Sequence, residues 1–564
     1  MAASDASATF PQLLATTVAA RPEHPALVTR EATLTYRELD RRTARMARAL
    51  LASGAGKGTR IGLLAPDGAL WLTTFCAALR IGALVTPMTT LGTPSELAHI
   101  IRTSDAQILI GVRRFLRRDY AETLSAALPG LADAEAGALR LTAAPYLRSV
   151  WLDDDAGLSW ARPVEELLSQ ADGPDAIDDA LLAAVESEVG PSDDAFVVYT
   201  SGSTATPKAV VHHQGSVAAQ PGVLASYFGI AAADRTMPLL PAFWMGGIAY
   251  ALQVLATGAT LVYPPGPGVD DVLDTVEAQG VTCVIVWHML AALRAAAAER
   301  GLDISSIRGL GARPVDADGE RIPTRRRGNP LGMSETFSIH SALPVDQPLP
   351  EGKQGAAGRA VNGIERRVVD PETGEPVAPG QVGELHVRGG ALMSGFYKVP
   401  RTQVFTPDGF YPTGDLVRID DDGFAFFVGR TGDMIKTNSA NVSRLEVEAA
   451  LNALADVELS LVAGLPDETL GELVVAAVVP APGEHPTEDG IRGALGEVLS
   501  SFKIPRRIVF IGHDDVPRTT TGKVRLFELG ALIESRLNGS HPEQPVPNGS
   551  RPNDRTRGGT AHDR

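Results

Sequence analysis

The stretch Tyr199-Thr200-Ser201-Gly202-Ser203-Thr204-Ala205-Thr206-Pro207-Lys208 is rich in hydroxyl and small side chains and ends in a lysine. It follows Ala195-Phe196-Val197-Val198-Tyr199, an apolar run of β-branched and aromatic residues that predicts a buried strand. Ligands of α/β folds bind where such strands end. Small residues let backbone N–H groups approach phosphate oxygens, and hydroxyls and the Lys208 ammonium add donors and charge. The stretch therefore predicts an α/β fold with a loop that holds a triphosphate.

Composition alone supports a second interpretation of this stretch, a polar Ser/Thr-rich loop without a ligand. A Walker-type phosphate loop is excluded, because no Gly-Lys-Ser/Thr ending follows. The choice between the two interpretations depends on motifs elsewhere in the chain.

Five motifs follow one another along the chain: Tyr199–Lys208, Gly332-Met333-Ser334-Glu335-Thr336, Tyr411-Pro412-Thr413-Gly414-Asp415, Gly429-Arg430 with Asp433, and Pro517-Arg518-Thr519-Thr520-Thr521-Gly522-Lys523. In these motifs and their order the chain resembles the adenylate-forming superfamily, which includes acyl-CoA synthetases, peptide-synthetase adenylation domains and luciferases. Thr33–Leu39 is also similar to the family's opening segment. Matches in this order across residues 199–523 are highly specific, so the phosphate-loop interpretation is favoured.

Periodicity in the first part of the chain indicates βα units. From about residue 10 to 190, helical-period segments such as Tyr36–Leu51 alternate with short apolar strands such as Arg60–Ala65 and Gln107–Val112. Near residues 350–428 strand and turn signals dominate, and Leu416–Ile419 with Phe424–Val428 predicts a hairpin. These patterns predict an N-terminal body, residues 1–428, with two layered α/β subdomains and a β-rich subdomain.

A second, smaller α/β unit is predicted after this body. Its signals are a helix near 443–454, a strand near 473–479 and a helix that starts around Val524. Residues 429–433 are interpreted as a hinge and residues 434–537 as a mobile lid domain. The tail, residues 538–564, has almost no large apolar residue and is predicted to be disordered.

Bulk composition excludes several classes of protein. The chain has 564 residues and a net charge of −16, which argues against a nucleic-acid groove or an anionic membrane surface as the main partner. Its two cysteines, Cys76 and Cys283, exclude a disulfide framework and are expected to be buried. No signal peptide or stretch of apolar residues long enough to cross a bilayer is evident, so a soluble cytoplasmic protein is expected.

The resemblance assigns roles in ATP binding and catalysis. Glu335 would hold Mg²⁺ together with Thr204, Asp415 would accept hydrogen bonds from the ribose, and Lys523 would reach the substrate carboxylate and the α-phosphate. The catalytic residues are then Lys523, Glu335 and Thr200. The nucleotide-binding residues are Thr200, Ser201, Gly202, Ser203, Thr204, Lys208, Gly311, Ala312, Leu331, Gly332, Met333, Ser334, Asp415, Arg430 and Lys523. The simpler alternatives are a helix cap for Glu335, an Asx turn for Asp415 and a surface ion pair for Arg430.

Less specific matches concern the acyl pocket and CoA. The pocket lining is predicted to be Trp244, Gly246, Gly247, Trp287, His288 and Phe337, with plain core packing as the alternative for each. Ser501-Phe502-Lys503-Ile504-Pro505-Arg506-Arg507 is similar to a further family segment, whose basic residues would either contact the nucleotide end of CoA or form a solvated face.

Several positions depart from the family pattern. Ala205 and Ala209 replace glycines, and an alanine held at positive φ would cost roughly 1–2 kcal/mol. Leu331 replaces a tyrosine that stacks on adenine, and Trp244 replaces a histidine beside the carboxylate pocket. The remaining departures are Gly432 at the hinge pivot, Asn438-Ser439 in place of a glycine pair, and a short spacing from Gly311 to Gly332 that predicts a trimmed helix.

The resemblance implies an ATP-dependent carboxylic acid–CoA ligase that uses ATP, Mg²⁺ and CoA, forms an acyl-adenylate and then a thioester. One alternative keeps the adenylation step but has another acceptor, which would be a carrier-protein thiol, an amine, or nitrite in a diazotisation. An alternative of a different class is a catalytically silent nucleotide-binding protein. The identity of the acid and the oligomeric state are not predicted.

Overall fold

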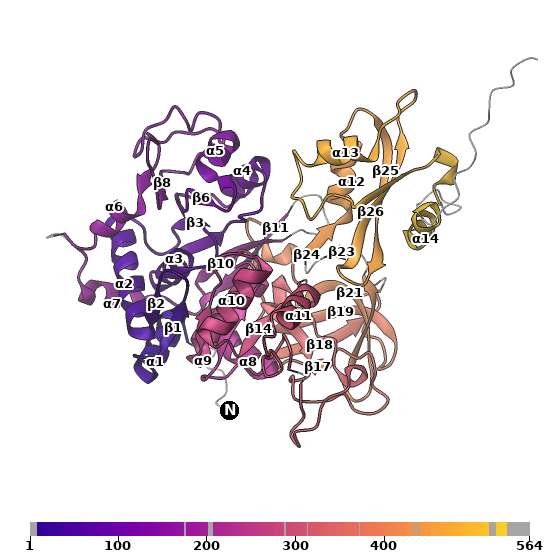
Figure 1. Ribbon diagram of the computed structural model, residues 1–564, viewed down its shortest axis with the longest axis horizontal. Helices are drawn as coiled ribbons and strands as arrows, with labels where there is room; N and C mark the ends of the chain where they lie inside the picture. The colour runs from indigo at the N-terminus through magenta and orange to yellow at the C-terminus, as the bar shows by residue number, and fades with distance from the viewer. Residues whose placement is uncertain are drawn as a thin grey trace, which may run out of the picture.

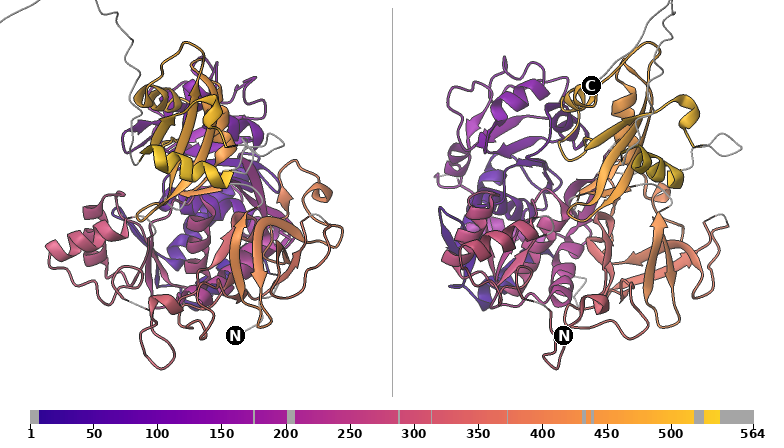
Figure 2. Two further views of the ribbon diagram at one scale, coloured as in Figure 1. Left: turned by 90° about the vertical axis from the view of Figure 1, so that its right-hand side faces the viewer. Right: turned by 45° about the vertical axis from the view of Figure 1, so that its right-hand side comes forward.

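A computed structural model describes residues 8–173, 176–200, 207–286, 289–312, 314–371, 373–430, 434–437, 440–517 and 526–537 (Figure 1). These residues form a large α/β body and a smaller C-terminal domain, as the sequence predicts. In both views of Figure 2 the C-terminal domain, coloured orange to yellow, lies against the body as a separate lobe. Within the described residues, no helix is long and apolar enough to cross a membrane.

An eight-stranded sheet organises the first half of the body. Its strand order is β20-β11-β10-β4-β3-β5-β8-β9, with parallel pairing from β10 to β9 and antiparallel pairing of β11 with both β10 and β20. The bounds are β3 Arg60–Leu64, β4 Leu84–Pro87, β5 Ile108–Gly111, β8 Ser149–Leu152, β9 Arg162–Pro163, β10 Asp194–Thr200, β11 Lys208–His213 and β20 Gly395–Phe396. Associated helices are α3 Ala69–Arg80, α4 Pro94–Thr103, α5 Tyr120–Ala127, α6 Val164–Ser169 and α7 Asp179–Ser187, and β6 Arg114–Phe115 pairs with β7 Arg118–Asp119. The predicted strands at residues 60–65, 107–112 and 195–199 are confirmed.

A second sheet of five strands completes the layered part, in the order β14-β12-β13-β1-β2. Its strands are β1 Pro25–Val28, β2 Thr33–Thr35, β12 Arg235–Pro238, β13 Thr260–Val262 and β14 Cys283–Ile285. The helices of this part are α1 Phe10–Ala20, α2 Tyr36–Ala52, α8 Gln214–Phe228, α9 Met245–Thr257, α10 Val269–Gln279 and α11 Leu290–Glu299.

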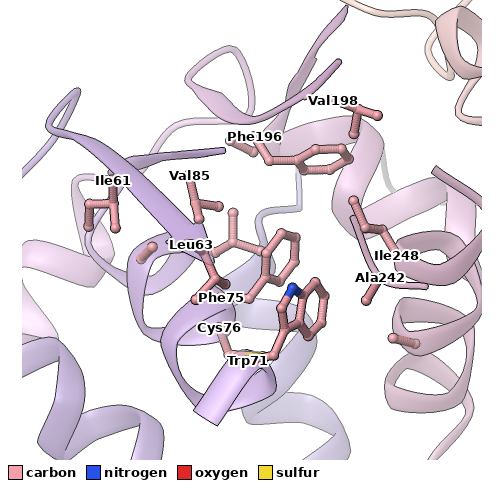
Figure 3. Packing of buried hydrophobic residues seen from close by; sticks show 14 of the residues in the cluster. Ile61, Leu63, Trp71, Phe75, Cys76, Val85, Phe196, Val198, Ala242 and Ile248 are labelled. Atoms are coloured by element: carbon pink, nitrogen blue, oxygen red, sulfur yellow. The ribbon is translucent and has the colours of Figure 1, made fainter. Parts of the chain in front are cut away.

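The main core lies where helices of the two sheets pack together. Trp71 and Phe75 of α3 stack with ring centroids 4.7 Å apart, and Phe75 lies 5.7 Å from Phe196 of β10. Figure 3 shows these rings between the strand residues Leu63 and Val85 and Ile248 of α9. Cys76 is buried in the same cluster, and burial raises the pKa of its thiol to about 12, so it is an inert thiol as predicted.

The β-rich part follows α11. A three-stranded sheet, β15-β16-β17, precedes a four-stranded antiparallel sheet, β18-β19-β21-β22. The predicted hairpin is confirmed: β21 pairs with β22 across a turn in which Gly423 adopts φ 79°. The bounds are β15 Leu331–Met333, β16 Ser338–Ala342, β17 Arg359–Ala360, β18 Ile364–Val369, β19 Val382–Gly389, β21 Tyr411–Ile419 and β22 Ala425–Arg430, with 3-10 helices η1 Thr324–Arg326, η2 Ser334–Thr336 and η3 Arg401–Gln403.

The C-terminal domain is a sheet with helices on both faces. Its strand order is β24-β23-β26-β25, and β27 pairs parallel with β26. Helices α12 and α13 cover the face that looks toward the body, and α14 covers the opposite face (Figure 1). The bounds are β23 Met434–Thr437, β24 Ala440–Ser443, α12 Arg444–Asn452, β25 Val457–Asp467, β26 Gly471–Pro480, α13 Glu488–Leu495, β27 Arg507–Phe510, η4 His513–Asp515 and α14 Leu526–Leu537.

Candidate active site

A cavity of about 1050 Å³ lies between the body and the C-terminal domain. The body contributes β10, the cavity-facing side of α4, the start of α9 and the β15–β16 hairpin. The C-terminal domain contributes β23, β24 and the segments at residues 468–471 and 500–503. The aromatic side chains in the lining are those of His99, Tyr199, Phe228, Phe243, Trp244, Tyr250 and Phe502.

The strand ends that carry the predicted phosphate loop open into this cavity. Thr200 at the end of β10 pairs with Lys208 at the start of β11, and Thr200 and Pro207 line the cavity. The loop residues Ser201, Gly202, Ser203 and Thr204 lie outside the described residues. The Lys208 ammonium lies 5.1 Å from the centroid of the Phe396 ring, which holds the charge near these strand ends.

Ala209 does not carry the predicted backbone strain. The described non-glycine residues with positive φ are Asp105, Leu116, Phe337 and Lys398. Ala209 instead lies in the regular part of β11, opposite Tyr199, where an L residue is unstrained. The cost considered for an alanine held at positive φ therefore does not apply to Ala209, and Ala205 lies outside the described residues.

Glu335 is fixed in place by two neighbouring segments. It lies in η2, directly after the cavity-lining Ser334, and its backbone carbonyl accepts a hydrogen bond from Met393 N (2.9 Å). Its Oε1 accepts a hydrogen bond from the hydroxyl of Tyr411 (3.3 Å) at the start of β21. The carboxylate therefore has a partner in another sheet, which a mere cap of its own short helix would not require.

His212 of β11 supports the Ser334–Glu335 segment through a hydrogen bond. Its Nε2 lies 2.7 Å from the carbonyl oxygen of Ser334 and must carry the hydrogen, because a carbonyl only accepts. Burial lowers the pKa of His212 to about 3, so the ring stays neutral. Phe337 packs edge-on against this ring, with centroids 5.0 Å apart.

Asp415 lies inside strand β21, in register with Arg430 of β22. Asp415 is buried, and its backbone N–H donates to Oγ1 of Thr413 (3.1 Å). Strand pairing thus brings the two predicted ribose-binding positions together, although the side chain of Arg430 lies outside the described residues.

Several predicted positions are described but do not line the cavity: Lys208, Gly247, Gly311, Ala312, Leu331, Glu335, Phe337 and Asp415. Leu331 is buried in the main core, and Phe337 is fully buried between Phe196 and His212. Gly247 and Gly311 are positions of close backbone packing, because an added Cβ would lie 2.4 Å from the Pro241 carbonyl oxygen and 1.9 Å from that of Ile304, respectively. For Leu331 and Phe337, burial of the side chain corrects the predicted contact with a ligand.

Some of the other predicted residues line the cavity, and several lie outside the described residues. Gly332, Met333, Ser334, Trp244 and Gly246 line it. Ala312 is described but is not part of the lining. Trp287, His288, Lys523, Gly432 and Asn438-Ser439 lie outside the described residues. Between Gly311 and Gly332 the described residues form only one helical turn, η1, in agreement with the trimmed helix.

The structure also adds residues that the sequence did not single out. Tyr411 belongs to the motif Tyr411–Asp415, but the sequence assigns it no role. Its contact with Glu335 can be found only from the fold. Asp67, before α3, accepts a hydrogen bond from Ala242 N (2.7 Å) and so holds the turn that leads to Trp244. Glu96 lines the cavity, and its only signal in the sequence is a capping box, Thr93-Pro94-Ser95-Glu96.

Comparison with known families agrees with this geometry. The family model for AMP-binding enzymes matches residues 14–397, and the model for the C-terminal domain of the same enzymes matches residues 446–523. The chain belongs to the AMP-binding enzyme family. The predicted membership in the adenylate-forming superfamily is confirmed.

Individual relatives of this AMP-binding enzyme are named as ligases. A feruloyl-CoA synthase from Amycolatopsis sp is 32% identical over 503 residues, which cover 88% of this chain and 93% of the relative. An indoleacetate–CoA ligase from Aromatoleum aromaticum is 29% identical over 517 residues, covering 89% and 94%. These names agree with the predicted enzyme class, an AMP-forming acid–thiol ligase.

Among solved structures, the amide bond synthetase McbA from Marinactinospora thermotolerans has a TM-score of 0.72 and 23% identity, covering 93% of this chain and 99% of that one. A double mutant of o-succinylbenzoate CoA synthetase (MenE) from Bacillus subtilis has a TM-score of 0.70 and 22% identity, covering 92% and 97%. At these identities the likeness establishes the fold, a large body with a smaller C-terminal domain.

Proposed function

We propose that this AMP-binding enzyme is an ATP-dependent ligase that activates an aromatic carboxylic acid and transfers it to CoA. One observation carries the proposal: Thr200 at the end of β10, Ser334 next to Glu335, and a set of aromatic side chains all line one cavity of about 1050 Å³. A cavity of this size, with these aromatic side chains in its lining, suits a flat acid next to a nucleotide.

In the first step, an oxygen of the substrate carboxylate forms a bond to the α-phosphorus of ATP, and the bond from that phosphorus to the bridging oxygen breaks as pyrophosphate leaves. Two anions must approach each other, so positive charge and alignment lower the barrier. We assign phosphate binding to Thr200, Ser201, Gly202, Ser203, Thr204 and Lys208. Asp415 and Arg430 are assigned to the ribose.

Glu335 is the residue that we expect to hold Mg²⁺, together with Thr204. The oxygen of a carboxylate suits this hard cation, which usually takes one or two protein carboxylates and completes its shell with phosphates and water. No group of three or more His, Cys, Asp or Glu side chains in the described part of the chain could form a metal site of its own. Mg²⁺ would neutralise charge on the phosphate oxygens.

In the second step, the sulfur of CoA forms a bond to the acyl carbon, and AMP leaves with the electrons of the bond that breaks. We infer that the observed arrangement serves this step. The face of the C-terminal sheet with α12, β23 and β24 meets the cavity, whereas α14, which begins three residues after Lys523, lies on the opposite face (Figure 1).

We retain the predicted division of the chain. Strand β22 of the body ends at Arg430 and strand β23 of the C-terminal domain begins at Met434, which supports a hinge at residues 429–433. The assignment of residues 1–428 to the body and 434–537 to the lid remains a proposal. The cytoplasmic location remains a prediction.

The test is a panel of benzoic, phenylacetic, cinnamic and medium-chain aliphatic acids, assayed for pyrophosphate release with and without CoA. We expect release with aromatic acids and formation of their CoA thioesters. Release without thioester would favour another acceptor, and carrier protein and amines are then supplied in turn. No release with any acid, while ATP still binds, would favour a silent nucleotide-binding protein.

A further inference from the structure

A buried cluster of charges joins the two domains at the edge of the cavity. Lys503 Nζ of the C-terminal domain lies 2.8 Å from Glu96 Oε1 of the body and 2.8 Å from Glu446 Oε1 of its own domain. Ser500 Oγ donates to the other oxygen of Glu96, Oε2 (2.6 Å). The Lys503 side chain is only 8% exposed, so neither predicted interpretation, a solvated face or a free basic group for CoA, describes it.

Hydrogen bonds at the start of α4 position the Glu96 carboxylate independently of Lys503. Glu96 is the third residue of α4, and its Oε2 accepts the backbone N–H of Thr93 (2.9 Å), while Thr93 Oγ1 accepts the backbone N–H of Glu96 (3.3 Å). This reciprocal capping box fixes the carboxylate at the start of the helix. A preorganised acceptor binds its partner without losing further side-chain entropy.

The two carboxylates that contact Lys503 respond differently to burial. Burial raises the pKa of Glu96, but the Lys503 ammonium and the hydrogen bonds to Lys503, Ser500 and Thr93 outweigh it, so the pKa is lowered overall. Burial dominates at Glu446 and raises its pKa, because one ammonium cannot fully compensate two buried carboxylates. Glu96 and Glu446 therefore share the Lys503 ammonium at equal distances of 2.8 Å, and only the contact with Glu96 crosses between the domains.

The same segment also completes the wall of the cavity. Phe502 lies next to Lys503 and meets Trp244 of the body edge to face, with ring centroids 6.1 Å apart and planes at 86°. Trp244 stands where the family usually has a histidine, so a large ring here extends the body's reach to the other domain. Fixing Lys503 on Glu96 thus also fixes Phe502 on Trp244.

We propose that Glu96 is a positioning residue for thioester formation, which holds the C-terminal domain on the body through Lys503 and Ser500 while Phe502 closes the cavity against Trp244. This role rests on the proposed function, because it assigns the observed orientation to the second step. Glu96 need not touch any reacting atom; it acts through the domain that it anchors.

The test separates the two half-reactions in the full-length enzyme. Glu96→Gln removes the charge but keeps the capping box, which accepts Gln as well as Glu at this position. We expect pyrophosphate release in a single turnover to stay within about twofold of wild type and thioester formation from supplied acyl-adenylate to slow by about tenfold or more. This split is the readout that a merely structural role would not produce.

Two further variants make the result interpretable. Lys503→Met removes the ammonium that Glu96 binds and should likewise slow thioester formation but not pyrophosphate release. In the double variant, thioester formation should be no slower than in the slower single variant, because both substitutions remove the same Glu96–Lys503 interaction. Glu365→Gln is the matched control: it breaks an exposed ion pair with Arg388 in the body and should change neither step. Equal loss of both half-reactions, an unchanged thioester step in Glu96→Gln, or additive effects in the double variant would overturn the proposal.

The contact between the domains can be measured without any substrate. Failure of the anchoring role can therefore be distinguished from failure of the proposed function. Cys76 and Cys283 are buried, and dyes can therefore be placed selectively on Arg117→Cys of the body and Gly493→Cys of α13, both exposed positions. We expect energy transfer between the dyes to fall in Glu96→Gln and Lys503→Met but not in Glu365→Gln. Unchanged transfer in both cluster variants would contradict the anchoring role even if the enzyme proves to use another acceptor.

Discussion

At the scale of single residues, the chemistry of the site depends on carboxylates that the fold holds at defined points. Glu335 receives a hydrogen bond from Tyr411, and Asp67 receives one from the backbone of Ala242. We propose the first of these carboxylates as the metal ligand, whereas the second supports the turn before Trp244. Their substitution should therefore have different consequences.

Glu335→Gln is expected to impair magnesium use and not folding. The amide oxygen of Gln can still accept the Tyr411 hydrogen bond, so stability should stay within about 0.5 kcal/mol of wild type. Losing a charged ligand should raise the Mg²⁺ concentration for half-maximal pyrophosphate release by roughly tenfold, which corresponds to about 1.4 kcal/mol. A magnesium titration and thermal unfolding check both points. Strong destabilisation with an unchanged magnesium requirement would assign Glu335 a structural role instead.

Asp67 should make stability depend on pH near neutrality. Burial raises the pKa of Asp67 to about 7, although the Ala242 hydrogen bond opposes this. A carboxyl with a raised pKa in the folded state stabilises the fold while protonated, and that contribution is lost as pH rises from about 4 to about 7. Asp67→Asn keeps the acceptor but cannot ionise. Between pH 5.5 and 7.5, wild type should lose about 1–2 kcal/mol relative to this variant in urea unfolding. Parallel stability curves would show that Asp67 is ionised throughout.

At the scale of elements, strands β15 and β21 place the motif residues, and the sequence predicts only part of this. The helix at 36–51 and the hairpin of β21 and β22 follow from local periodicity and turn residues. The burial of Leu331 could not be predicted, because it depends on the register of β15 against β16 and on core residues distant in sequence. Phe337 likewise enters the core through a left-handed backbone conformation, φ 64°, that its residue type does not suggest.

Leu331→Tyr tests the placement of β15. If Leu331 faced the adenine, a tyrosine would tighten ATP binding by stacking. Because Leu331 is buried in the core, we expect instead a destabilisation of about 1–3 kcal/mol from overpacking and no gain in ATP affinity. Leu331→Met, which conserves volume, is the control and should cost less than about 1.5 kcal/mol. Thermal unfolding and ATP titration decide, and tighter ATP binding without destabilisation would refute the observed burial.

At the scale of the whole molecule, we expect the proposed thioester step to depend on how the C-terminal domain sits on the body. The sequence predicts two domains from the change in pattern after Arg430, but not their contact. Glu96 and Lys503 are 407 residues apart in the chain, and neither shows a signal for the other. Glu96 is explained locally by its capping box, and Lys503 by a motif that suggested CoA. Only the tertiary arrangement reveals that one carboxylate serves both the helix and the domain contact.

Lys523→Ala should produce the opposite kinetic signature to Glu96→Gln. The lysine is assigned to the point where the carboxylate meets the α-phosphate, so its loss should slow acyl-adenylate formation by about 10²–10³, as expected for one preorganised donor. Thioester formation from supplied acyl-adenylate should persist, because the helix that follows Lys523 lies on the face of the C-terminal sheet turned away from the cavity in the arrangement assigned to that step (Figure 1). Single-turnover assays of the two steps measure both rates. If Lys523→Ala slowed both steps equally, a single domain orientation would have to serve both reactions, and the orientation seen here could not be assigned to thioester formation alone.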